Sequence, residues 1–290
     1  MGQKQQSSRI NDALYVFHRD ISAPVTARDL ANVAAYSEQH FHRVFHKVVG
    51  ETVSQYIRRT RLEQAANQLM FDDRSTILDI AEKCGFSSLS SFSQVFKISF
   101  GSTPGRWRKK DKKNAYIPYL LDQEIAAAYQ RLSSVQLIQP DLVSLSPRTV
   151  AYVRHRGYGR AIRLAWQTLL AWAEMEQRDS EIQIGLHHSN PACIPLNQCR
   201  YVACMGIDRP VLRRGMVNTM TIPGGLHAAF VLNGQYGELL PYLSKILEQW
   251  LPASGFKMKT TPAFVQYSKN QFLSEDQQFE LTFYLPISAI

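Results

Sequence analysis

The chain has 290 residues, 45% of them hydrophobic, which is enough for two ordinary domains that each bury a core. Lysine and arginine number 33 against 24 aspartates and glutamates, a net charge of +9. The excess is concentrated at the front, because residues 1–113 hold 18 basic and 11 acidic side chains, which leaves 15 and 13 for the remainder. The front half is therefore suited to binding a polyanion such as nucleic acid.

The sequence argues against a membrane protein and against a metal or cofactor. No apolar run approaches the length of a membrane span, and the first residues lack the apolar core of a signal peptide. The four cysteines form no Cys-x-x-Cys pair, which fits a reducing cytoplasm, where the protein would be nucleoid-associated. His187 and His188 with Cys193 and Cys199 do not match the usual zinc spacings, so no metal site is expected.

A run of short helices is predicted in the front of the chain. A polar tail over residues 1–8 precedes helices predicted over 10–17, 27–34, 37–47, 53–70, 77–84 and 89–100. The segment 37–47, SEQHFHRVFHK, is amphipathic, with Phe41, Val44 and Phe45 on one face and amide, imidazole and guanidinium groups on the other. Such an outer face can pair with base edges in a major groove, but solvated basic faces are also common.

The first half of this region repeats in the second. Four matched pairs recur at an offset of 50 or 51 residues: Leu30-Ala31 with Ile80-Ala81, Tyr36-Ser37 with Phe86-Ser87, Val44-Phe45 with Val95-Phe96, and Gly50-x-Thr52 with Gly101-x-Thr103. Each copy has a small residue for close helix crossing, a sharp turn and a buried stripe on the second helix. These are the parts of a helix-turn-helix, so the repeat predicts two such motifs in an all-α domain over residues 9–110.

This region resembles the AraC family of bacterial transcription regulators. The likeness includes IAEKCGFSSLSSFSQVFKISFGSTPGRWR, residues 80–108, which is similar to the family's signature. The resemblance implies that the chain binds double-stranded DNA and contacts RNA polymerase. By position, it implies base contacts from Gln39, His42 and Arg43 in the first recognition helix and from Leu89, Ser90, Ser93 and Gln94 in the second. Phosphate contacts are expected from Lys47, Arg58, Arg59, Lys97, Arg106 and Arg108, although each could equally be a solvated surface charge.

The two recognition helices differ in chemistry. Arg43 can bridge both acceptors of a guanine and Gln39 can pair with an adenine edge, whereas Leu89 and Ser90 stand where many relatives carry Gln or Arg. The first helix is therefore expected to carry most of the sequence discrimination. Ala35 occupies a turn position where glycine is usual, which adds backbone strain.

A different repeat follows a linker predicted over residues 111–134. Between 135 and 290, Ala151-Tyr152-Val153 matches Ala229-Phe230-Val231 at an offset of 78, and Trp172 matches Trp250 at the same offset. Each half contains a strand-like run, a Gly-Tyr loop, an amphipathic helix and further strand-like runs. The pattern predicts an α+β domain of two βαββ repeats, with both helices on one face of the sheet and a cleft along the seam.

This second domain resembles the gyrase-inhibitor-like effector-binding domains. The matching segments include RHRGYGRAIRLAWQTLLAW, GLHHSNPACIP, IPGGLHAAFVLNGQY and the closing ELTFYLPI. The resemblance implies a small-molecule effector, cationic or amphiphilic, held by aromatic side chains and an acid. Many relatives place the acid where this chain has Thr282. Glu280 lies two residues earlier and shares its strand face, which leaves two alternatives: Glu280 replaces the acid, or the ligand is not cationic. The ligand contacts expected are Glu280, Thr282, Tyr158, Trp166, Tyr236, Tyr267 and Tyr284.

Together these features predict a DNA-binding transcription regulator, expected to be an activator, whose second domain senses a small molecule. Two alternatives for that domain remain open, a small-molecule hydrolase and a protein-interaction module. No Ser-His-Asp or Cys-His arrangement stands out in the sequence, and the fusion to a DNA-binding region favours sensing over turnover, so the chain is not expected to be an enzyme.

Overall fold

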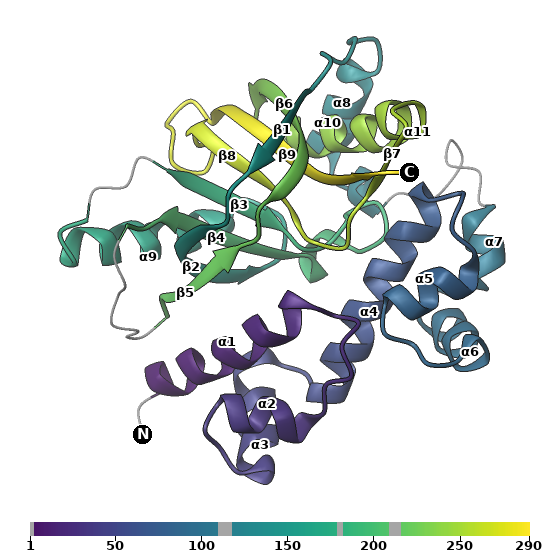
Figure 1. Ribbon diagram of the computed structural model, residues 1–290. Helices are drawn as coiled ribbons and strands as arrows, with labels where there is room; N and C mark the ends of the chain where they lie inside the picture. Colours follow the sequence, from purple (N-terminus) through teal and green to yellow (C-terminus); the bar gives the residue numbers. More distant parts are fainter. Residues whose placement is uncertain (1–2, 110–117, 179–181, 209–215) are drawn as a thin grey trace. The chain divides into compact units, whose positions relative to one another are not determined.

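The structure is a computed structural model that describes residues 3–109, 118–178, 182–208 and 216–290 (Figure 1). The chain divides into two compact units, a helical one formed mainly by residues before 110 and a sheet-rich one formed mainly by residues from 118 onward. In the described part of the chain, we find no helix that is both long and apolar enough to cross a membrane.

The helical unit contains seven helices among its described residues. They are α1 (Gln3–Arg19), α2 (Ala27–Val33), α3 (Glu38–Val49), α4 (Val53–Phe71), α5 (Ile77–Lys83), α6 (Leu89–Phe100) and α7 (Pro104–Arg108). The predicted helices are found with small shifts of their ends. Helix α1 differs most, because residues 3–8, predicted as a polar tail, form its first turns.

The same capping residues recur in the two halves of the helical unit. Thr26 and Asp29 form a capping box at the start of α2, and Thr76 and Asp79 form the same box at the start of α5. Such boxes satisfy backbone N–H groups that a helix start would leave unpaired. Gly50 ends α3 in the left-handed conformation with φ 83°, and Gly101 ends α6 in the same way with φ 67°. The internal repeat of the sequence is thus a repeat of local structure.

Aromatic side chains fill the core beneath each motif. In the first motif, Phe41 and Phe45 of α3 are fully buried, and the Phe45 ring meets Tyr56 of α4 edge-on at 5.6 Å. In the second, Phe96 of α6 meets Trp107 of α7 at 5.8 Å. The Trp107 indole N–H donates to the Ala66 carbonyl of α4 at 3.1 Å, which anchors the short last helix.

Among its described residues, the sheet-rich unit has nine strands together with several helices. Its elements are η1 (Pro118–Leu121), α8 (Gln123–Leu132), β1 (Asp141–Leu145), β2 (Arg148–Arg156), α9 (Ile162–Met175), β3 (Gln183–His187), η2 (Leu196–Gln198), β4 (Arg200–Gly206), β5 (Asn218–Ile222), β6 (Gly225–Gln235), α10 (Leu239–Lys245), the π-helical η3 (Ile246–Trp250), α11 (Leu251–Ala253), β7 (Phe256–Met258), β8 (Ala263–Lys269) and β9 (Gln278–Ala289). The main sheet has the order β1-β6-β9-β8-β3-β4-β2-β5, with β7 paired to β9.

The helices cover one face of this sheet. Trp166 of α9 packs against Tyr267 of β8 at 5.8 Å, and Trp250 of η3 packs against Phe230 of β6 at 5.1 Å. Because Tyr267 pairs with Leu281 and Phe230 with Phe283 on β9, these side chains share a face. Their neighbours along the strands therefore point to the opposite face, which we call the open face.

Helix α8 belongs to the sheet-rich unit, although the sequence placed it in a linker over residues 111–134. Arg131 of α8 forms an ion pair with Glu238 at 3.0 Å, and the buried ammonium of Lys245 donates to the Leu132 carbonyl at 2.8 Å. The linker prediction is wrong for this segment, because long-range contacts with α10 fix it. Residues 111–117 of the predicted linker lie outside the described residues.

Candidate functional site

The first recognition helix, α3, presents its predicted base-contacting side chains to solvent. The Ser37 hydroxyl accepts from the His40 backbone N–H at 3.4 Å and so caps the helix start. Phe41, Val44 and Phe45 are buried, and this fixes the rotation of α3 about its axis. Gln39, His42 and Arg43 are consequently all exposed on the other side of the helix.

A chain of side-chain contacts holds Arg43 in place. Its Nη2 lies 2.9 Å from Nδ1 of His40, and because a guanidinium can only donate, His40 is the acceptor. The His40 ring packs on Tyr36 with centroids 4.7 Å apart, and the Arg9 guanidinium of α1 lies 5.1 Å from the Tyr36 ring centre. His40 was not among the predicted site residues, although its spacing of three residues from Arg43 on one helix could have identified it.

The second recognition helix, α6, is positioned in the same way but carries a plainer surface. The Ser88 hydroxyl accepts from the Ser91 backbone N–H at 3.3 Å, and Phe92 and Phe96 are buried beneath the helix. Leu89, Ser90 and Gln94 are exposed, and Ser93 is half-buried. This face offers two short hydroxyls, one amide and an apolar side chain, with no cation among the four predicted positions.

The residues predicted to contact phosphate fall into two groups. Lys47, Arg58, Lys97 and Arg106 are exposed. Arg59 instead pairs with Glu51 at 3.0 Å and Glu63 at 2.6 Å, and these two carboxylates raise the pKa of its guanidinium despite its burial. Arg108 is half-buried and donates to the Ser75 carbonyl at 2.9 Å. The guanidinium groups of Arg59 and Arg108 therefore already have partners within the helical unit.

Arg61 of α4 ties the two motifs together. Its guanidinium donates to the carbonyls of Ile21 and Ala23, which follow α1, at 2.8 Å each. It also donates to the carbonyl of Gly85, the turn of the second motif, at 3.0 Å. Burial lowers the pKa of this guanidinium, because desolvation disfavours the charged form. One side chain therefore bridges the loop before α2 and the turn before α6.

In the sheet-rich unit, three of the predicted ligand residues lie in a closed aromatic cluster on the helix-covered face. The Trp166 indole N–H donates to the Tyr201 hydroxyl at 3.3 Å, and the Tyr201 and Tyr267 hydroxyls are 3.3 Å apart. Tyr158 meets Tyr201 edge-on at 6.4 Å, and burial raises the pKa of both Tyr201 and Tyr267. Tyr201 was not predicted as part of this group.

Tyr236 is linked to that cluster through Phe272, whose ring also meets Tyr201 edge-on at 5.9 Å. The Arg160 guanidinium sits 4.1 Å from the centre of its ring, and Phe272 meets the ring edge-on at 6.2 Å. Its place is therefore beside an arginine and a phenylalanine.

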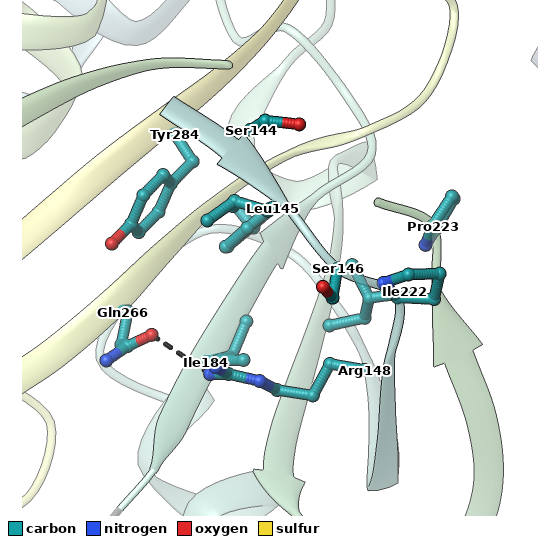
Figure 2. A pocket seen from close by; sticks show the side chains of 11 residues that line it. Ser144, Leu145, Ser146, Arg148, Ile184, Ile222, Pro223, Gln266 and Tyr284 are labelled. Carbon is teal, nitrogen blue, oxygen red and sulfur yellow. Dashed lines mark hydrogen bonds between the residues drawn. The ribbon is translucent and has the colours of Figure 1, made fainter. Parts of the chain in front are cut away.

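A pocket of about 450 Å³ lies on the open face, and of the predicted residues only Tyr284 lines it (Figure 2). The Tyr284 ring stacks on Phe264 with centroids 4.9 Å apart. The lining comprises Ser144, Leu145, Ser146, Pro147, Arg148, Ile184, Ile222, Pro223, Phe264, Gln266 and Tyr284. The pocket thus collects residues from strands β1, β2, β3, β5, β8 and β9 and from the turns beside them.

Glu280 and Thr282 share the open face with Tyr284 but stand outside the pocket lining. Thr282 is half-buried and is the cross-strand partner of Gln266, which does line the pocket. Glu280 is exposed at a position paired with Lys269. The structure therefore places the predicted ligand residues on two opposite faces of the sheet.

His187 and His188 do not form a metal site with Cys193 and Cys199 in the described structure. The His187 ring lies edge-on to Tyr158 at 5.3 Å and to Tyr201 at 5.4 Å. Burial lowers the pKa of His187 to about 4 and that of His188 to about 3. Within the described ranges, no three histidine, cysteine or acidic side chains gather as metal ligands.

Two capped helix-turn-helix motifs joined by α4 and followed by a sheet-rich domain define a two-domain protein with an AraC-type DNA-binding region. The helix-turn-helix domain model matches residues 30–110, and the model described as a GyrI-like small molecule binding domain matches residues 138–288. Because the second match spans more than half of the chain, this chain belongs to the GyrI-like family, with an AraC-type helix-turn-helix domain in front of the GyrI-like domain.

Similar proteins match over 34–38% of this chain. The TetD protein of transposon Tn10 from Escherichia coli is 39% identical over 100 residues, 34% of this chain and 72% of that protein. The transcriptional activator AarP of Providencia stuartii is 35% identical over 106 residues, 37% of this chain and 78% of AarP. The right origin-binding protein of Escherichia coli K12 is 33% identical over 111 residues, and the match covers 38% of each chain.

Proposed function

We propose that this protein is a sequence-specific transcription regulator that binds double-stranded DNA through α3 and α6. The observation that carries the proposal is the exposed set of Gln39, His42 and Arg43 on a helix whose opposite face is locked into the core. Two equivalent motifs in one chain would let a monomer enter successive major grooves about one helical turn apart. Helix α3 supplies most of the discrimination, since α6 lacks a cation at its predicted base-contacting positions.

Two substitutions separate base contacts from phosphate contacts. Arg43→Ala should cost about 1–3 kcal/mol of binding free energy and relax the preference at one base position. Lys97→Ala should weaken binding to all sequences alike and reduce the steepness of the fall of log affinity with log salt concentration by about one. Both effects can be measured by binding to an operator selected in vitro and to its single-base variants. Equal, sequence-independent losses from both variants would contradict the assignment of Arg43.

We infer that the protein acts as an activator that contacts RNA polymerase and responds to a small molecule. The relative AarP is named a transcriptional activator, and the second domain belongs to a small-molecule-binding family. Ligand control requires that the effector bind the two functional states with different affinities. A ligand that binds without changing operator affinity or transcription in vitro would refute this part of the proposal.

For the GyrI-like domain we favour binding over catalysis. The described residues that line the open-face pocket include two serines but no histidine or carboxylate that could activate them. Incubation with activated esters should therefore release no product above the buffer rate. Turnover by the pure protein would favour the hydrolase alternative, and a co-purifying protein partner without small-molecule binding would favour the interaction module.

We also infer that this domain consists of two βαββ repeats. The orders β2-α9-β3-β4 and β6-α10-β8-β9 support this, with β1, β5 and β7 as additions. In the sheet, the equivalent strands β3 and β8 lie side by side at the centre, and β2 and β6 lie the same number of strands away on either side.

A further inference from the structure

The open-face pocket has the size and lining of a small-molecule site. Its volume of about 450 Å³ lies within the usual range for ligand pockets. Ile184, Phe264 and Ile222 form an apolar floor and are all nearly fully buried. The Tyr284 ring, which Figure 2 shows, adds a flat aromatic wall. It stacks on the ring of Phe264 with an inclination of only 24°. A planar apolar body would fit against these surfaces.

The charge of the pocket is positive. Arg148 is the one ionised side chain among the described residues that line it, and no carboxylate is among them. Arg148 Nη1 donates to Gln266 Oε1 at 3.2 Å, so the guanidinium is already turned toward the β8 side of the pocket (Figure 2). The Ser144 and Ser146 hydroxyls and the Tyr284 hydroxyl add neutral hydrogen-bonding groups to the lining.

Glu280, the acid that could have favoured a cationic ligand, does not line the pocket. It lies on the same face but is exposed and has Lys269 as its backbone partner on β8, beside a β-bulge. Thr282, the nearer position on β9, is uncharged. A cation in this pocket would meet the positive field of Arg148 without a compensating carboxylate, whereas a guanidinium binds a carboxylate through paired N–H donors.

We propose that the pocket binds a small organic anion with a flat apolar body, its carboxylate or similar group placed on Arg148. This inference rests on the proposed sensing function and deepens it by naming the ligand class. Arg148 is the specificity-determining residue, and the Tyr284–Phe264 wall holds the apolar part.

The test compares probes that share a naphthylmethyl body and carry an anionic, a neutral or a cationic polar group. Naphthaleneacetate, its neutral amide and naphthylmethylammonium are titrated into the full-length protein by calorimetry. The anion should bind at least about tenfold more tightly than the amide, because a charge-assisted pair is stronger than a neutral hydrogen bond. Arg148→Gln should remove this preference, while Arg156→Gln, an exposed arginine at the far end of the same strand, should leave it unchanged. Ser144→Trp, at an exposed lining position, should block all three probes.

Several results would overturn the inference. These are tighter binding of the ammonium probe, an unchanged anion affinity in Arg148→Gln, or no binding of any probe. Operator affinity is measured on the same samples to separate this inference from the proposed function. If the anion binds as expected but operator affinity stays constant, the ligand class stands and ligand control fails; if no probe binds while operator binding persists, the pocket inference alone fails.

Discussion

The turn between the two helices of each motif offers a matched pair of substitutions. Ala35 adopts φ 51° in the first motif, and Gly85 adopts φ 80° at the equivalent place in the second. A residue with a side chain pays about 1–2 kcal/mol for the left-handed conformation. Replacing alanine by glycine removes this strain, but it also lowers the free energy of unfolding by about 0.4–1 kcal/mol, because the unfolded chain gains conformational freedom. Ala35→Gly should therefore stabilise the helical unit by about 0.5–1 kcal/mol.

The reverse change, Gly85→Ala, should destabilise the helical unit by more than Ala35→Gly stabilises it. A Cβ on Gly85 would lie 2.7 Å from Cζ of Arg61, so the guanidinium would have to move. That side chain donates to the carbonyls of Ile21, Ala23 and Gly85, so moving it disturbs three hydrogen bonds. Hydrogen bonds to charged groups are worth about 1.5–3 kcal/mol each, and loss of one brings the total for Gly85→Ala to about 2–4 kcal/mol.

Native-state hydrogen exchange on the full-length protein measures these differences in peptides from the helical unit, separately from the sheet-rich unit. The decisive comparison is a double-mutant cycle with Arg61→Ala, since Gly85→Ala should cost only about 0.5–1 kcal/mol once the guanidinium is absent. Equal costs of Gly85→Ala in the two backgrounds would refute the role assigned to Arg61. A destabilising Ala35→Gly would refute the strain assigned to that turn.

Three further predictions concern binding and pH. His40→Phe keeps an aromatic ring but removes the Nδ1 acceptor that holds Arg43. Discrimination at the base contacted by Arg43 should therefore fall about fivefold in His40→Phe and recover in His40→Asn. Binding to single-base variants of the operator measures both effects. Arg58→Ala should reduce the steepness of the fall of log affinity with log salt concentration by about one, which a salt titration measures. Arg59→Ala should leave that steepness unchanged and instead destabilise the helical unit, which urea unfolding measures. Burial lowers the pKa of His187 from 6.5 to about 4, so the unfolded chain takes up a proton first and the stability of the sheet-rich unit should fall as the pH drops from 6.5 toward 4. His187→Gln should lessen this loss in urea unfolding at several pH values, and an unchanged pH dependence would contradict it.

Much of the helical unit is determined by local sequence. The capping pairs Thr26 with Asp29 and Thr76 with Asp79 act within one helical turn, so the helix starts can be read from the residues alone. The apolar stripe on α3 likewise fixes which side chains are buried, and by exclusion it exposes Gln39, His42 and Arg43. The second motif could be predicted as well, because the same local pattern of residues recurs 50 or 51 positions later.

Tertiary structure decided the features that depend on distant partners. Arg61 looks like its neighbours Arg58 and Arg59 in sequence, yet its guanidinium donates to the carbonyls of Ile21, Ala23 and Gly85, because the fold brings those distant loops to α4. Strand alternation predicted that Glu280 and Thr282 share a face. It could not show that this face lies opposite α9 and η3, because that depends on where those two helices pack. The pocket itself joins β1 and β2 to β3, β8 and β9, and this meeting depends on the order of strands in the sheet, which is set by long-range pairing rather than by any local pattern.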